Sequence, residues 1–384
     1  MGWDRRAPDL MCEPASLVVG RWAMVAGGAV LAGVLLFLLQ ASTLGSPLRA
    51  VNVWVLSCAP LVICVLAFGA RAHVYGNALS HRQFLQEQAQ HAQQAWQDWA
   101  HRYLAVQASC VLLPDQVSAP LLSQSALNLP RRTGQARSIA ALASQEDRVL
   151  AGIDRLLAAV LPALQALPLG QPLRVTLLCD TPPGEASRVA WLGHCARQIP
   201  QAKPESVTLV STLPYGWIDE TLKAASAGVE LVLVLQVAGG KLYSDGLAAL
   251  LLCPDQLAVE WDLPEQARLY RPMSLDTTQL NAELAVFFQS QVIARNAQGL
   301  LVDRAAWVPS LGDVSAAAGA QGASLQADQR WVKEHLCGIP GPFSDWLLAA
   351  LGVEMARLAQ RSLLLLSESH ARQWISTVSV ENPA

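Results

Sequence analysis

Val229-Glu230-Leu231-Val232-Leu233-Val234-Leu235-Gln236-Val237 is an almost unbroken apolar run. A strand that is apolar on both faces is buried on both faces, which is typical of a largely parallel sheet covered by helices on each side. The run therefore predicts a central strand of an α/β domain.

Helical and strand patterns alternate around this run. Residue periodicity predicts helices over 147–167, 185–198, 218–226, 280–294, 315–325 and 345–360. It predicts strands over 109–114, 173–179, 207–210, 246–252, 268–271, 362–367 and 372–380. Strand–helix alternation favours layers of helix on sheet. We expect a domain over 108–384 made of two related α/β halves, 108–275 and 276–384, packed as five layers.

Two uncharged apolar runs precede the domain, over 22–39 and 51–70. At ~1.5 Å per residue, each is long enough to cross a ~30 Å hydrocarbon layer as a helix. They predict a transmembrane hairpin within 17–71, after an N-terminal segment at 1–16. The small residues Gly20, Gly27, Gly28 and Gly33 either let the helices approach closely or are simply common in membrane helices.

Positive charge lies mainly outside the hairpin. Arg5, Arg6 and Arg21 precede it, Arg71 and Arg82 follow it, and Arg49 alone lies between the two runs. The positive-inside rule predicts a multi-pass protein of the cytoplasmic (inner) membrane, with both termini and the large domain in the cytoplasm. A cleaved signal peptide is the alternative, but the first run is long and acidic residues precede it.

Composition limits the partners. The chain has 52% hydrophobic and only 15% charged residues, which suits a membrane anchor with a large core. A net charge of −3 and the lack of a basic stripe exclude a nucleic-acid-binding role. The eight cysteines form no CxxC pairs or His/Cys clusters, so we expect buried apolar thiols and no metal site. No sequence pattern predicts a cofactor.

A linking amphipathic helix is predicted over 72–107. Leu85, Trp96, Trp99 and Tyr103 recur at helical spacing and share one face. This face either packs on the domain that follows or binds a partner protein, so these four residues are a candidate interaction face.

Several segments resemble the β-ketoacyl synthase family. The family has a segment in which a lysine, a spacer, a Gly-His pair and an Ala-rich stretch follow one another. It is similar to Trp307-Val308-Pro309-Ser310-Leu311-Gly312-Asp313-Val314-Ser315-Ala316-Ala317-Ala318-Gly319-Ala320. Residues 218–237 and 243–252 are similar to its helix, strand and Gly-Ala-Ala strand, and 363–380 to its closing strand pair. The resemblance covers 108–384. It implies a thiolase-like two-half α-β-α-β-α layered domain after the hairpin and linking helix.

The family's chemistry needs a cysteine at a strand-to-helix turn and two basic residues that stabilise the developing oxyanion. On the resemblance, Leu213 or Pro214 stands at the nucleophile position, Val308 at the lysine position and Asp313 at the histidine position. No histidine occurs between His194 and His335. The resemblance therefore implies a catalytically degenerate relative without catalytic residues.

Three functions remain open, one of which is an orphan immunity or regulatory membrane protein. A fold without its nucleophile can still bind chains or proteins, which favours a non-catalytic membrane-anchored adaptor or chaperone. Such degenerate proteins resemble accessory proteins of type VI secretion, so a secreted effector is one expected partner. The alternative is a membrane-associated acyl-transfer or acyl-binding protein that uses Cys337. The family also implies a homodimer or heterodimer through a sheet edge near Val229–Val237.

Overall fold

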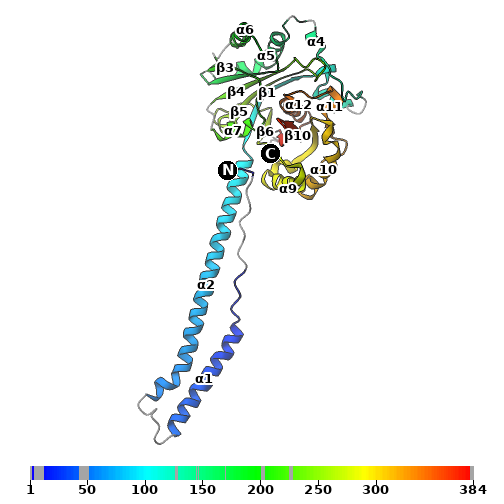
Figure 1. Cartoon of the computed structure of the whole chain (residues 1–384). Helices are drawn as coiled ribbons and strands as arrows, with labels where there is room; N and C mark the ends of the chain where they lie inside the picture. The colour runs from blue at the N-terminus through cyan, green and yellow to red at the C-terminus, as the bar shows by residue number, and fades with distance from the viewer. Residues whose placement is uncertain are drawn as a thin grey trace. The chain divides into compact units, whose positions relative to one another are not determined.

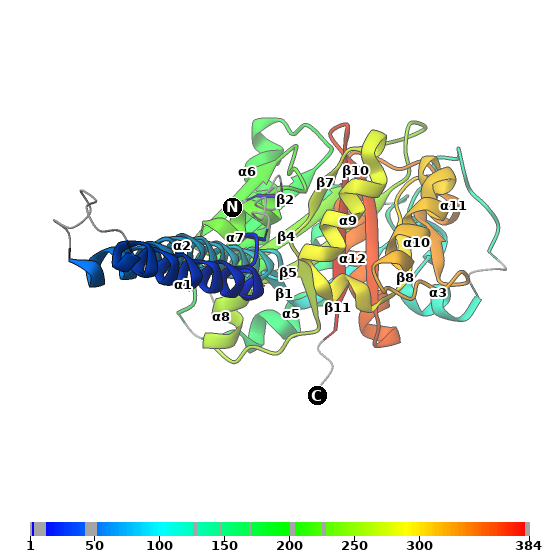
Figure 2. The same ribbon diagram turned by 90° about the horizontal axis from the view of Figure 1, so that it is seen from below.

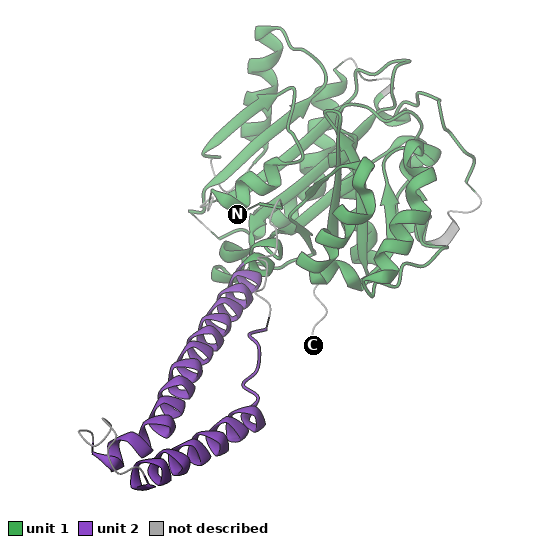
Figure 3. Cartoon of the chain, turned by 60° about the horizontal axis from the view of Figure 1, so that its bottom comes forward, with its two compact units in different colours: residues 1–3, 96–384 green, residues 4–95 purple. Residues whose placement is uncertain are grey.

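The computed structural model describes residues 2–3, 13–42, 52–125, 129–143, 145, 147–168, 170–199, 204–224 and 228–380. The chain forms two compact units, coloured separately in Figure 3. One unit is residues 4–95, and the other joins residues 1–3 to residues 96–384. Each unit is described by itself.

The smaller unit is a helical hairpin of α1 (Val19–Ser42) and most of α2 (Val53–Ala100). Both helices are long and apolar enough to cross a membrane, and their apolar side chains are largely exposed. A third helix, α5 (Arg148–Ala166), also meets that length and composition, but its apolar face is buried in the larger unit. These findings support membrane association through α1 and α2.

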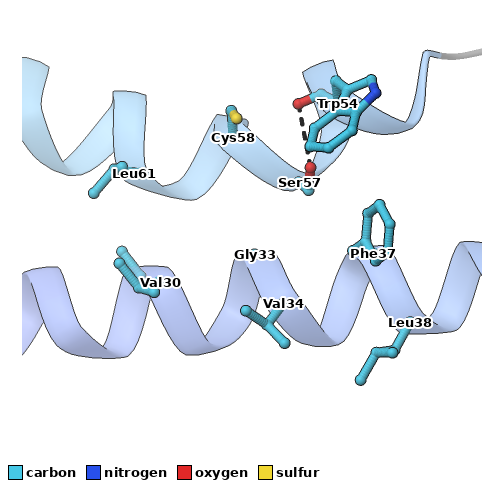
Figure 4. Close-up of a pocket in the computed structure, with 10 residues that line it drawn as sticks. Val30, Gly33, Val34, Phe37, Leu38, Trp54, Ser57, Cys58 and Leu61 are labelled. Atoms are coloured by element: carbon cyan, nitrogen blue, oxygen red, sulfur yellow. Dashed lines mark hydrogen bonds between the residues drawn. The ribbon is translucent and has the colours of Figure 1, made fainter.

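The two hairpin helices touch at Gly33. A Cβ placed on this residue would lie 2.3 Å from the Ser57 carbonyl oxygen, whereas Gly20, Gly27 and Gly28 have open space beside them. Figure 4 shows Gly33 of α1 opposite Ser57 of α2. Close helix approach thus depends on one of the four glycines.

The N-terminal half of the larger unit is a five-stranded sheet in the order β3-β2-β4-β5-β1, of which Figure 1 labels β3, β4, β5 and β1. Its strands are β1 (Tyr103–Leu112), β2 (Leu173–Cys179), β3 (Ser206–Val210), β4 (Val229–Gln236) and β5 (Gly246–Pro254). β3, β2 and β4 are parallel, and β5 runs antiparallel to both β4 and β1.

The C-terminal half repeats this plan in the order β9-β8-β10-β11-β6. Its strands are β6 (Ala267–Tyr270), β8 (Ala297–Val302), β9 (Arg330–Val332), β10 (Ser362–Ser369) and β11 (Arg372–Ser379). β9, β8 and β10 are parallel, and β11 runs antiparallel to both β10 and β6. A short strand, β7 (Met273–Leu275), adds to β11. Antiparallel pairing of β1 with β6 joins the two halves into one 11-stranded sheet.

The two half-sheets and three layers of helices make five layers, with the N-terminal half cyan to green and the C-terminal half yellow to red in Figure 2. α5 and α6 (Glu185–Gln198) cover the outer face of the first half, and α9 (Leu280–Ser290) and α10 (Leu311–Ala320) cover that of the second. The middle layer holds α3 (Ala119–Ser125), α7 (Trp217–Lys223) and α12 (Ser344–Ala359). The remaining short helices are α4 (Ala140–Ala143), α8 (Asp255–Glu260) and α11 (Lys333–Cys337).

Alternation along each strand produces these layers. In β4, Leu231, Leu233 and Leu235 face the outer core, and Val232 and Val234 face the middle layer. The run at 229–237 is therefore a buried central strand, as its sequence predicts. α5 begins because Asp147 caps it by accepting hydrogen bonds from the backbone N–H groups of Val149 and Leu150, each at 3.0 Å.

Several sequence predictions need correction. α2 is one continuous helix that ends at Ala100, so the linking helix over 72–107 is wrong at its C-terminal end. Tyr103 opens β1 instead of extending the helical face. β4 pairs with both β2 and β5, so 229–237 is not a sheet edge, and β3 is the outermost strand of that half in the described residues. The strand order places β6 in the C-terminal half, so the boundary between the halves lies between α8 and β6 and not at residue 275.

Candidate functional site

The turn between β3 and α7, residues 211–216, lies at the carboxyl end of a parallel strand, where α/β proteins commonly bind ligands. Its backbone closes tightly, because the Trp217 amide donates to the Pro214 carbonyl at 2.8 Å. Leu213 is half-buried, Pro214 is exposed and Tyr215 is buried. The turn thus presents no thiol.

Aromatic rings fill the space beneath the turn. Tyr215 packs edge-on against Trp346 of α12 and Trp374 of β11, with ring centroids 5.7 and 6.3 Å apart. The Tyr215 hydroxyl lies 2.9 Å from Ser376 Oγ. Trp346 Nε1 donates to the Leu213 carbonyl at 2.8 Å. The turn is therefore fixed by contacts to both α12 and β11.

A buried charged cluster lies at the corresponding ends of the C-terminal strands. Asp303 follows β8, Lys333 follows β9, and Asp345 is in the first turn of α12; all three side chains are buried. The Asp303 carboxylate accepts hydrogen bonds from Trp307 Nε1 at 3.1 Å and from the Glu368 amide at 3.0 Å. Lys333 Nζ donates to the Ser344 carbonyl at 3.3 Å.

Desolvation dominates the electrostatics of this cluster. Burial raises the pKa of Asp303 to about 6 and the pKa of Asp345 to about 7. Burial lowers the pKa of Lys333, although both carboxylates oppose that shift. The Asp345 carboxylate accepts a hydrogen bond from the Trp346 amide at 2.8 Å, and Ser344 Oγ has no hydrogen-bond partner among the described residues. The cluster can therefore hold or exchange a proton near neutral pH.

A pocket of about 600 Å³ opens beside the turn, at the carboxyl ends of β2 and β3. Asp180, Glu185, Arg188, Ser211, Tyr243 and Phe343 are among its lining residues. Asp180 organises one wall, because its carboxylate accepts from the amides of Val237 and Ala238 at 3.0 and 2.8 Å. It also accepts from the Tyr243 hydroxyl at 3.1 Å.

The cysteines of the larger unit are poor nucleophiles. Burial raises the pKa of Cys110 and Cys179 to about 11, and the pKa of Cys195, Cys253 and Cys337 to about 12. Only the thiolate attacks an acyl group, so the raised pKa values reduce the nucleophilic fraction of these thiols at neutral pH. Among the described residues no group of three or more His, Cys, Asp or Glu side chains could hold a metal ion.

The structure separates the sequence-predicted site residues. Leu213 and Pro214 occupy the turn, but Val308 is 44% exposed and Asp313 is exposed at the start of α10. α10 packs on the outer face of the C-terminal sheet, whereas the turn contacts the middle layer on its other face. Asp313 therefore does not meet Leu213.

Sequence reasoning missed Asp303, Lys333 and Asp345. Each follows a strand or opens a helix, and a charged residue at such a place normally reads as solvated. The strand order, which brings the ends of β8, β9 and α12 together, is the signal that reveals them.

The predicted interaction face is also divided. Leu85 belongs to the smaller unit, and Tyr103 is on a strand. Trp96 and Trp99 pack inside the larger unit, where Trp99 lies 5.2 Å from Trp3 and beneath the Arg271 guanidinium at 4.3 Å. Trp99 thus contacts Arg271 of the domain, and Trp96 Nε1 donates to the Gly2 carbonyl at 3.1 Å.

Comparison with solved structures agrees with this topology. A chain from the complex of a type II polyketide synthase acyl-carrier protein with its ketosynthase superposes with a TM-score of 0.52 at 13% identity, over 73% of this chain and 100% of that chain. The chain has a thiolase-like fold. A Streptomyces albus oxazolomycin ketosynthase domain gives 0.49 at 12% identity, over 73% of this chain and 96% of that domain. The Xanthomonas oryzae 3-oxoacyl-(acyl carrier protein) synthase III gives 0.45 at 11% identity, over 73% and 99%.

No family model and no curated protein matches the sequence. The likeness to solved structures is below 25% identity, so it establishes the thiolase-like fold and no activity.

Proposed function

We propose that the chain is a non-catalytic, membrane-anchored interaction protein that uses a thiolase-like domain to hold a partner protein at the bilayer. The turn between β3 and α7 carries this proposal. It presents Leu213 and Pro214, and Tyr215 and Trp346 occupy the space beneath it. Neither a leucine nor a proline at the family's nucleophile position can form an acyl-enzyme.

The alternative acyl-transfer function receives less support. Cys337 is the cysteine on which it would depend, and its side chain is 5% exposed. Burial raises its pKa to about 12, and the nearby Lys333 ammonium lowers that value only in part. The thiolate fraction at neutral pH is therefore very small.

The N-terminus supports the proposed membrane arrangement. Trp3 Nε1 donates to the Pro272 carbonyl at 2.9 Å, and the Trp3 ring packs against Trp99 and Phe287. Residues 1–3 and the large domain thus form one compact unit, although α1 and most of α2 lie between them in the chain. An even number of membrane crossings between residue 3 and the domain returns the chain to the same side of the bilayer, which this packing requires. The flanking arginines then favour the cytoplasmic side of the inner membrane.

A secreted effector of a type VI system is the partner class that the family resemblance favours. A second copy or a related chain could add to the sheet at β3, since its outer edge has no strand partner in the described residues.

Acyl-thioester labelling tests the loss of catalysis. We expect intact-mass analysis of the full-length protein in detergent to show no acyl adduct after incubation with acetyl and octanoyl thioesters. Pro214→Cys is the matched variant, because it places a thiol at an exposed position of the turn, where iodoacetamide should add one adduct relative to the wild type. A wild-type adduct on Cys337 would instead support the acyl-transfer alternative.

Co-expression with effectors encoded beside the gene tests the partner role. A defined complex of full-length chain and one effector, stable through purification, is expected. Failure of every such effector to associate, together with an acyl adduct on the wild type, would overturn the proposal.

A further inference from the structure

An arginine-lined pocket of about 610 Å³ lies at the amino ends of β8 and β10. This is the opposite end of the C-terminal strands from Asp303, which follows β8 at its carboxyl end. Arg268, Arg295 and Arg361 line the pocket, together with the polar side chains of Asn296, Gln298, Ser324, Ser362 and Ser379. The pocket is therefore separate from the candidate site described above.

Positive charge in this pocket is only partly compensated. Arg268 forms an ion pair with Glu265 at 2.8 Å and stacks over the Tyr103 ring at 4.7 Å. Arg295 donates its Nε to the Phe288 carbonyl at 3.0 Å, which orients the guanidinium without neutralising it. Neither Arg295 nor Arg361 forms an ion pair within the described part of the chain. Among the described residues that line the pocket there is no carboxylate.

A second pocket of about 200 Å³ adjoins the first. Gln298 and Arg361 line both pockets. The second is more apolar, with Trp331, Met355 and Leu363 among its lining residues. A ligand that enters both would meet guanidinium groups at one end and hydrocarbon at the other.

We propose that these adjoining pockets bind an anionic amphiphile, with a phosphate headgroup between Arg295 and Arg361 and a short hydrocarbon segment against Trp331 and Met355. The arginine fork matches phosphate oxygens in bidentate geometry. A pocket of about 610 Å³ is within the size range of ligand sites and is far larger than a carboxylate group needs. The ligand is either a membrane phospholipid or a soluble phosphorylated acyl compound, which share this chemistry. The inference is independent of the partner role proposed above.

Titration calorimetry on the full-length protein in uncharged detergent tests the site. We expect lysophosphatidic acid with an eight-carbon chain to bind at least about tenfold more tightly than glycerol 3-phosphate, inorganic phosphate or octanoate. Arg295→Ala and Arg361→Ala should each weaken it by about tenfold or more, because each removes a charge-assisted contact. Arg372→Ala, an exposed arginine outside the pocket, is the matched control and should bind like the wild type.

The hydrocarbon half needs its own variant. Ala359 is exposed at the rim of the apolar pocket, so Ala359→Phe fills that space without disturbing the core. This variant should bind lysophosphatidic acid no better than glycerol 3-phosphate. Equal binding of octanoate and lysophosphatidic acid by the wild type, or full binding by both arginine variants, would overturn the proposal.

Nanodiscs distinguish the two sources. If bilayer lipid reaches the site, nanodiscs with phosphatidic acid will abolish binding of the soluble ligand, and nanodiscs of phosphatidylcholine alone will not. Undiminished binding in both assigns the site to a soluble phosphorylated acyl compound.

Discussion

Asp180 and Asp303 occupy equivalent positions in the two halves of the sheet. The Asp180 amide donates to the Leu235 carbonyl at 3.2 Å, and its carboxylate accepts from the amide of Val237, two residues further on. The Asp303 amide donates to the Leu366 carbonyl at 3.1 Å, and its carboxylate accepts from the amide of Glu368, again two residues further on. The repeat thus extends from strand order to individual hydrogen bonds.

The surroundings of the two carboxylates differ. Asp180 is partly exposed and lines the 600 Å³ pocket. Asp303 has no solvent exposure, and burial raises its pKa to about 6, a shift that the Glu368 amide and the buried Lys333 ammonium offset only in part. The aspartate is therefore accessible to solvent in the N-terminal half and buried in a charged cluster in the C-terminal half.

Replacing each aspartate by asparagine separates these roles. Asp303→Asn leaves the Lys333 ammonium short of a counter-charge, so we expect a loss of about 3 kcal/mol in unfolding free energy. Asp180→Asn weakens hydrogen bonds at a partly solvated position and should cost about 1 kcal/mol. Denaturant unfolding of the full-length chain in detergent measures both. Equal losses would show that enclosure of Asp303 has no energetic consequence.

The enclosed carboxylates also predict a pH dependence. The folded pKa values of Asp303 and Asp345, about 6 and about 7, lie above the ordinary value for aspartate. The folded state therefore binds more protons than the unfolded state between about pH 4 and 7, so stability falls as pH rises through this window. Asp345→Asn should flatten the decline between pH 5 and 7, measured as thermal midpoints. An unchanged slope would mean that Asp345 is ionised throughout.

Local sequence patterns predicted much of the fold because they report burial directly. The run at 229–237, the helix at α5 and the closing strands β10 and β11 are all continuous or strongly periodic, and each is where its pattern predicts it. β8 and the three-residue β9 were missed. β9 is too short to show a period, and its place depends on pairing with β8.

The centre of the candidate site was not predictable in the same way. Two Ala-rich segments, α10 and α12, have similar composition, and only the strand order places α12 in the middle layer. The prediction at Asp313 followed the first segment, whereas Asp345 opens the second. Burial of Lys333 and Asp345 depends on contacts between residues far apart in sequence, which no local pattern records.

Contact between the hairpin helices should depend on Gly33. The Cβ of any larger residue would approach the Ser57 carbonyl to 2.3 Å, so Gly33→Leu should force α1 away from α2. Gly28→Leu is the matched control, since nothing lies within 4 Å of a Cβ there. Cysteines at Phe37 and Trp54, whose rings lie 5.8 Å apart, report the distance by oxidative cross-linking. The yield should fall with the first variant and persist with the second; equal yields would contradict close packing at Gly33.

Arg271 contacts both the end of α2 and the helix after the turn at the candidate site, so we expect it to stabilise the turn. Its buried guanidinium stacks over Trp99 of α2 and forms an ion pair with Asp219 of α7, the helix that follows the turn. Arg271→Met keeps the apolar stem but removes both interactions, so we expect a loss of about 2–4 kcal/mol in unfolding free energy. Lys223 also pairs with Asp219, at 2.5 Å, but is far more exposed, so Lys223→Met should cost about 0.5 kcal/mol.

Trp217, at the start of α7, should become accessible to iodide quenching only with Arg271→Met, measured in a chain whose other exposed tryptophans are replaced by phenylalanine. Equal quenching in the two variants would show that Arg271 stabilises the fold without ordering the turn.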